Sequence, residues 1–341
     1  MEKTEKKRIF YFDFLRAIAI TSVIICHSLA LNPFAPLGGG RLNLFPLDTL
    51  GYIGVPLFFM LSGALLLNRE YDLQTFFKKR FSRIVYPYIF WFCIIAILNY
   101  FVFNITLKKI IFIGMGIDSF TWYIWELIGL YLFIPIINTF IKEYSEKGIH
   151  YYLFFWVITI SLNTIGKYPF HNLDLSYFSG YLGFLLLGYY LSNKQFKLNE
   201  KWIMIISFII FLVSFIIHSE LRIICIETLT SSGYLNIFPL IETGSLFIFI
   251  KYLSEYYNSS ISPIKSKNFI NLKNYICKLI FSISYCSYAM YFTHTIAINL
   301  VNTFTDINIS FLALVIEFFL AWIIALISSK IPIVKNFAGV K

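Results

Sequence analysis

Long apolar runs separated by short polar segments make up almost the whole chain. Runs long enough to cross a bilayer as helices cover residues 10–31, 48–67, 81–103, 119–141, 149–165, 177–192, 202–217, 234–257, 275–300 and 308–330. A membrane β-barrel would instead show segments of about ten residues with alternating polarity. The pattern therefore predicts an all-α polytopic integral membrane protein with about ten transmembrane helices. These helices are expected to form a single transmembrane domain over residues 1–341.

The distribution of lysine and arginine predicts how these helices are oriented. Of the 28 Lys and Arg residues, 22 fall on one side of the expected spans and 5 on the other, while Arg16 lies within a span. Cytoplasmic loops carry such an excess, so both termini are expected in the cytoplasm. The net charge of +10 is explained by this orientation, and no nucleic-acid partner is expected. The five cysteines are scattered without metal-ligand spacing, so no metal site is expected.

The first span carries ionisable residues that a lipid-facing helix would not tolerate. It contains Asp13, Arg16 and His27, and each such group costs about 2.5–3.5 kcal/mol at the centre of a bilayer. Arg16 and His27 are eleven residues apart, so they project from one helix face at depths that differ by about 16 Å. One reading is a functional polar face. The other is a structural Asp13–Arg16 pair with His27 as a hydrogen-bonded core residue, and the spacing leaves both open.

Several motifs of this chain resemble those of the acyltransferase 3 family. Its opening, Asp13-Phe14-Leu15-Arg16 followed by ten residues and His27-Ser28, is similar to that of the family. Further similar segments follow in the family's order at residues 54–63, 77–84 with Pro87, 122–135 and 287–294. The chain departs from the family pattern at Thr121, where many members have histidine, and at Glu126, where an apolar residue is expected.

The resemblance implies an O-acyltransferase of a bacterial plasma membrane. Members move an acyl group from cytoplasmic acyl-CoA, usually acetyl-CoA, to a hydroxyl of a cell-surface polysaccharide or its lipid-linked precursor. Acetyl-CoA would be a donor substrate, and no permanently bound cofactor is implied. A homo-oligomer and a glycan-synthesis complex both stay open. The alternative is a carrier or exporter of a small polar solute or glycan, because buried charges serve carriers equally well.

The resemblance also assigns roles on the donor side. Arg80 and Arg83, with Lys78 and Lys79, are expected at the cytoplasmic mouth, where arginine suits the phosphates of CoA. The same residues also fit simple positive-inside anchoring. Arg16, paired with Asp13, is expected to hold the diphosphate or the pantetheine arm. That arm would then follow the shared helix face and bring the thioester to His27.

His27 is expected to act as the general base that deprotonates the acceptor hydroxyl. A relay through acetyl-imidazole is the competing route.

Acceptor-side candidates lie in later spans. His294 is expected at a depth similar to that of His27, and His294, Tyr291 and Glu126 are predicted to contact the substrate. Glu242 and Glu317 also fall in the outer halves of spans, and the sequence does not decide which glutamate lines the site. Ser62-Gly63 is predicted to be a helix-packing segment, and His218 carries no functional signal.

Overall fold

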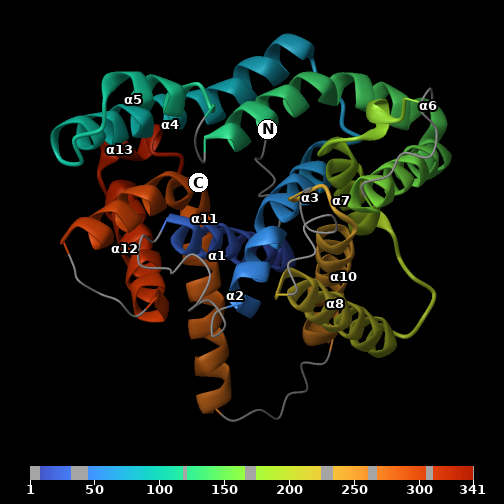
Figure 1. Cartoon of the computed structure of the whole chain (residues 1–341). Helices are drawn as coiled ribbons and strands as arrows, with labels where there is room; N and C mark the ends of the chain where they lie inside the picture. The colour runs from blue at the N-terminus through green and yellow to red at the C-terminus, as the bar shows by residue number, and fades with distance from the viewer. Residues whose placement is uncertain are drawn as a thin grey trace, which may run out of the picture.

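The protein is built entirely from helices where the structure describes it. The computed structural model describes residues 8–31, 45–117, 121–165, 174–223, 233–259, 267–304 and 310–340, and every regular element in these ranges is helical (Figure 1). Seven helices in these ranges are long and apolar enough to cross a membrane. The all-α polytopic prediction is therefore confirmed, while the number of crossings and the side of the termini stay predictions.

Three helices form the centre of the bundle. They are α1 (Phe10–Leu31), α3 (Gly54–Leu66) and α11 (Lys267–Phe304). Helix α1 packs against both α3 and α11. Upstream of α3, the short helices α2 (Phe45–Leu50) and η2 (Gly51–Ile53) complete the second expected span. This arrangement buries the polar face of α1 against other helices rather than against lipid, as its charged residues require.

A second group of helices flanks this centre. It contains α4 (Leu73–Phe101), α5 (Leu107–Gly114) and the long α6 (Trp122–Ile165). Asp72 caps α4 by accepting a hydrogen bond from Thr75 N at 2.9 Å, and this bond lowers the pKa of Asp72. The expected spans 119–141 and 149–165 are the two halves of α6, which breaks at Ser145 with φ 52° and ψ −139°.

The remaining helices complete the bundle on either side. One set is η3 (Ser176–Phe178), α7 (Leu182–Asn193), α8 (Glu200–Ile223) and α10 (Ile237–Ser259); the other is α12 (Ser310–Lys330) and α13 (Pro332–Phe337). Helix α10 packs on α8 and α7, and α12 packs on α11 and α1. Figure 1 shows α8 and α10 on the opposite side of the centre from α12 and α13.

Small residues allow α3 and α7 to approach closely. A Cβ on Gly63 would overlap the carbonyl oxygen of Leu185, and a Cβ on Gly188 would overlap that of Met60. Helices in lipid associate through such small-residue packing, because lipid tails supply no hydrophobic driving force between them. Gly63 thus makes the close helix contact predicted for Ser62-Gly63, whereas Ser62 lines a cavity on another side of α3.

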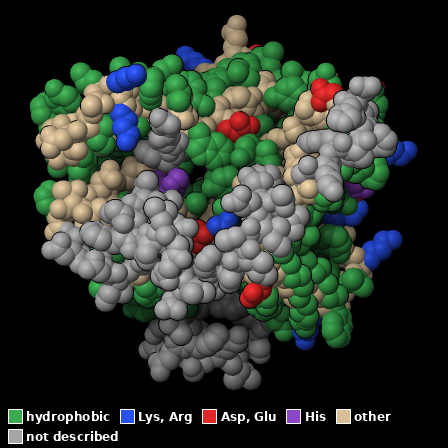
Figure 2. Space-filling view, viewed as in Figure 1, with side chains coloured by type: hydrophobic (Ala, Val, Ile, Leu, Met, Phe, Trp, Pro, Cys, Tyr) green, Lys and Arg blue, Asp and Glu red, His purple; other side chains and the backbone are tan. Residues whose placement is uncertain are grey.

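The outer surface of the bundle is strongly apolar. Hydrophobic side chains cover much of the described face in Figure 2, with few charges among them. Large exposed hydrophobic residues occur along α4, α6, α8 and α12, including Ile97, Phe101, Phe154, Ile209 and Phe319. Such a surface suits contact with lipid.

Candidate active site

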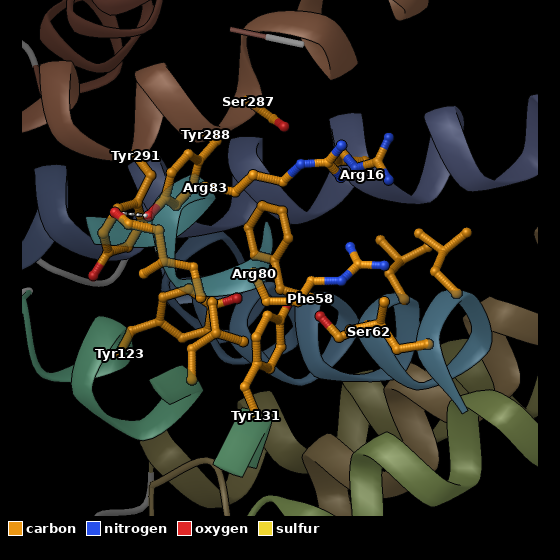
Figure 3. A pocket seen from close by; sticks show the side chains of 15 residues that line it. Arg16, Phe58, Ser62, Arg80, Arg83, Tyr123, Tyr131, Ser287, Tyr288 and Tyr291 are labelled. Atoms are coloured by element: carbon orange, nitrogen blue, oxygen red, sulfur yellow. Dashed lines mark hydrogen bonds between the residues drawn. The ribbon is translucent and has the colours of Figure 1, made fainter. Parts of the chain in front are cut away.

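A cavity of about 230 Å³ brings together the three arginines that the sequence singled out. It lies between α1, α3, α4, α6 and α11, and Arg16, Arg80 and Arg83 all line it (Figure 3). The other lining residues are Phe58, Leu61, Ser62, Leu65, Leu66, Ile84, Tyr123, Leu127, Tyr131, Ser287, Tyr288 and Tyr291. No carboxylate is among the described residues of this wall. This arginine cavity is therefore suited to an anionic ligand.

A network around Asp13 positions Arg16. Asp13 is buried and accepts two hydrogen bonds from Arg8, at 2.6 and 2.8 Å. It also accepts one from Ser284 at 2.6 Å, while Arg16 Nη1 approaches Asp13 at 3.4 Å and Ser284 at 3.1 Å. Arg8 thus makes the closer pair with Asp13, and Arg16 remains available to the arginine cavity.

The network gives Arg8 a structural role. Arg8 is one of the 22 basic residues whose distribution predicts the orientation of the chain, yet it is also the main ionic partner of Asp13. A contact with Phe281, whose ring centroid lies 4.6 Å from the Arg8 guanidinium carbon, holds Arg8 further. Asp13 therefore supports the arginine cavity from behind Arg16 and is not part of its wall.

The lysines of the same basic segment lie elsewhere. Lys78 and Lys79 are exposed, and neither is among the residues that line the arginine cavity. Arg80, which directly follows Lys79 on α4, and Arg83, three residues further on, do line it. Both arginines therefore contact the cavity, although Arg80 is only half-buried and Arg83 is exposed, whereas the two exposed lysines lie outside its wall.

A second cavity, of about 440 Å³, is less suited to a polyanion. It lies at the break in α6, and its cations already have acidic partners: Lys142 contacts Glu70 at 3.2 Å, and Lys194 contacts Glu146 at 2.5 Å. The hydrogen bond that Lys194 donates to Glu146 raises the pKa of Lys194, which keeps the lysine paired and protonated. The arginine cavity has no such acidic lining among its described residues.

The arginine cavity ends at two tyrosines. Figure 3 shows the arginine side chains extending toward one end of the cavity and Tyr123 and Tyr291 lying at the other. The ring centroids of these tyrosines are 5.3 Å apart, and both side chains are buried. We call Tyr123 and Tyr291 the tyrosine layer.

Two imidazoles lie next to the tyrosine layer. The ring centroid of His294 is 6.0 Å from that of Tyr291 and 5.1 Å from that of His27. His294 Nδ1 lies 3.2 Å from the carbonyl oxygen of Met290. Because a carbonyl only accepts, Nδ1 carries the proton, which makes Nε2 the basic nitrogen of the neutral ring. The structure therefore forms a histidine pair, His27 and His294, from helices α1 and α11.

One feature differs from the expected path of the donor. A passage was expected along the face that Arg16 and His27 share, but neither histidine lines the arginine cavity. Tyr291, one turn before His294 on α11, lines the cavity, and its ring lies close to both Tyr123 and His294. The arginine cavity and the histidine pair are thus neighbouring compartments with a tyrosine layer between them.

The three candidate glutamates have different surroundings. Glu126 is partly buried and lies near Tyr181. Glu242 is fully buried and lies 2.9 Å from His218 Nδ1. Glu317 is fully buried beside Ser28, the residue that follows His27. Glu317 therefore lies beside the residue that directly follows His27 on α1.

The structure adds a polar cluster that the sequence analysis missed. Besides the His218–Glu242 pair, Arg222 donates hydrogen bonds to Asp48 and to Tyr52, the latter at 2.6 Å. These contacts join α8 to α2 and η2. The position of His218 near a helix end gave no reason to expect a function. Its pairing with Glu242 could have been predicted, because the two ionisable residues lie at matching ends of neighbouring spans.

These features place the chain in the class of polytopic membrane proteins with charged groups buried between helices. A family model described as an acyltransferase domain, that of the acyltransferase 3 family, matches residues 9–331. The chain therefore belongs to the acyltransferase 3 family and is a membrane acyltransferase. Comparisons with curated proteins and with solved structures each gave no significant match.

Proposed function

We propose that the protein transfers an acyl group, in the simplest case acetyl, from cytoplasmic acyl-CoA to a hydroxyl of a cell-surface polysaccharide or its lipid-linked precursor. The observation that carries this proposal is the arginine cavity: three guanidinium groups from two helices line one space without a described carboxylate. A polyanionic donor such as CoA matches that charge. Family membership supports acyl transfer over a carrier function.

The size of the cavity suggests how the donor is arranged. Its volume of about 230 Å³ is smaller than the roughly 300–1,000 Å³ that a whole drug-sized ligand occupies. The narrow pantetheine arm fits such a space better than the nucleotide does. In this proposal the nucleotide phosphates stay at the mouth with Arg80 and Arg83, and the arm passes Arg16 toward the tyrosine layer.

The histidine pair supplies the chemistry in this proposal. The acceptor oxygen forms an ester bond to the acyl carbon, the thioester carbon–sulfur bond breaks, and CoA leaves. His27 takes the proton of the hydroxyl as general base and returns it to the sulfur, so atoms and charges balance. In the competing route an imidazole nitrogen first accepts the acyl group and then passes it to the acceptor.

Radiolabelled acetyl-CoA provides the test. Purified protein in lipid nanodiscs is incubated with the labelled donor and with envelope polysaccharide from cells that make the protein. The proposal expects release of CoA and alkali-labile label on the polysaccharide. Folded protein that neither releases CoA nor labels the glycan would contradict it. Uptake of solute by proteoliposomes without any label transfer would instead favour the carrier.

A further inference from the structure

We propose that the tyrosine layer selects the length of the acyl group, admitting acetyl and excluding longer straight chains. This inference rests on the proposed function, since it concerns an acyl-CoA donor that enters through the arginine cavity. It names Tyr123 and Tyr291 as specificity-determining residues. Their position follows from the fold: one comes from the start of α6, the other from the middle of α11.

The first argument is that the layer lies on the direct route to the histidine pair. Tyr123 and Tyr291 both line the arginine cavity, and their exposed fractions are 6% and 3%. The Tyr291 ring centroid lies 5.3 Å from that of Tyr123 and 6.0 Å from that of His294, so Tyr291 contacts both the cavity wall and the histidine pair. In this proposal a thioester that starts in the arginine cavity passes these rings before its acyl carbon reaches an imidazole.

The second argument is that aromatic packing continues behind Tyr123. Its ring contacts Phe59 at 5.1 Å, and Phe59 contacts Tyr181 at 4.8 Å. Trp122 then links Tyr181, at 5.6 Å, to Tyr234, at 5.7 Å. Tyr234 in turn lies 3.8 Å from the sulfur of Cys26, the residue before His27. Aromatic rings therefore pack one on another behind Tyr123, where a bulky chain would have to displace them.

The third argument concerns the energy of extra methylenes. Close-packed rings tolerate added volume poorly, because overpacking forces side chains from their preferred rotamers. One methylene in a fitted pocket changes discrimination by about 10–200-fold. A butyryl group adds two methylenes to acetyl at the position of the rings. The wild-type protein is therefore expected to prefer acetyl-CoA to butyryl-CoA by at least about 10-fold in kcat/KM.

The test compares donors of different length in variants of the layer. CoA release is measured with acetyl-CoA, butyryl-CoA and hexanoyl-CoA for the wild type and for Tyr123→Ala and Tyr291→Ala. Removing either ring opens the layer, so the ratio of butyryl to acetyl kcat/KM should rise about 10-fold or more. Tyr291→Phe keeps the ring and loses only the hydroxyl, so it should keep the wild-type ratio.

A tyrosine elsewhere in the same cavity provides the matched control. Tyr131 also lines the cavity but lies two turns further along α6, so Tyr131→Ala should change all three donors in proportion. An unchanged ratio in Tyr123→Ala and Tyr291→Ala, or equal use of all donors by the wild type, would overturn the inference. If an alanine variant fails to fold, leucine at the same position replaces it and must raise the ratio in the same direction. Absence of turnover with every donor in the wild type would instead count against the proposed function.

Discussion

The ring centroids of His27 and His294 lie 5.1 Å apart, although 267 positions separate the two residues along the chain. Helices α1 and α11 bring them together, and His294 also lies next to Tyr291 at the end of the arginine cavity. Imidazole is the side chain best suited to accept and return a proton near neutral pH. The pair therefore offers two basic nitrogens where the donor path ends.

Replacing His27 tests its role in proton transfer. His27→Ala should lower acyl transfer by about 10²–10⁴-fold, the usual contribution of a positioned general base. Donor affinity should persist, because His27 does not line the arginine cavity. Label transfer and acetyl-CoA binding are measured on the same preparation. Turnover at the wild-type rate would exclude His27 as the base.

The covalent route makes a separate prediction about the same pair. If an imidazole carries the acyl group, a rapid burst of CoA release should occur without acceptor, and intact protein should gain the mass of one acyl group. His294→Ala and His27→Ala then show which ring is modified. A steady rate without a burst or a mass change favours direct transfer with His27 as base.

Charge at the cavity mouth should govern donor affinity. Arg80→Gln with Arg83→Gln removes two guanidinium groups from the cavity wall. Hydrogen bonds to charged groups are worth about 1.5–3 kcal/mol each, so each lost guanidinium group should weaken acetyl-CoA binding by roughly 10–100-fold and the double variant by about 100-fold or more. Isothermal titration calorimetry measures the change.

Lys78→Gln with Lys79→Gln is the matched control, because it changes the net charge equally at exposed positions outside the wall. It should weaken binding only slightly, and raising the salt concentration should remove that small effect. Equal losses in both double variants would show that overall charge, and not the cavity, attracts the donor.

Close packing of α3 on α7 makes Gly63 a sensitive position. Gly63→Ala places a Cβ against the carbonyl oxygen of Leu185, and overpacking of this kind costs about 1–3 kcal/mol. The thermal midpoint of the detergent-solubilised protein should fall. Gly129→Ala is the control, because a Cβ there meets nothing within 4 Å. Its midpoint should stay or rise, since alanine favours a helix by about 0.8–1 kcal/mol over glycine.

Hydropathy and charge along the sequence were enough to predict the helices and part of the candidate site. Apolar runs of bilayer length predict the helices, because lipid leaves the backbone few alternatives. The grouping of Arg16 with Arg80 and Arg83 was also anticipated, since each belongs to a motif near the same end of its helix. Both inferences depend on local sequence and on the direction in which each span crosses the membrane.

The remaining features depend on contacts between distant segments. Nothing local marks Tyr123 and Tyr291 as a layer, because tyrosine is common throughout the chain and only the fold brings these two rings, from α6 and α11, into contact. The break at Ser145, by contrast, falls in the polar segment 142–148 between two expected spans, so its place was predicted, although α6 continues on both sides of it. Arg8 binds Asp13 by folding back on α1, which a count of loop charges does not reveal.

The surroundings of Glu242 and Glu317 predict that replacing each glutamate by leucine has opposite effects on stability. Glu242→Leu leaves His218 buried without its acidic partner, and breaking a buried pair costs about 3–5 kcal/mol. Glu317 is equally buried, but no cation among the described residues pairs with it. Glu317→Leu should therefore preserve or raise stability, since it removes the free-energy cost of burying a carboxyl group in apolar surroundings.

The two substitutions should affect catalytic activity in the opposite order to stability. Glu317 lies beside Ser28, next to His27, so Glu317→Leu should lower kcat by at least about 10-fold, as expected for a buried ionisable group near the reacting atoms. Glu242→Leu should lower yield and thermal midpoint, while the fraction that remains folded keeps its kcat. Thermal unfolding and turnover per folded molecule are measured for both variants. A stable Glu317→Leu protein with unchanged kcat would show that this carboxyl group has no part in the reaction, and the search for the acceptor-side residue would return to Glu126.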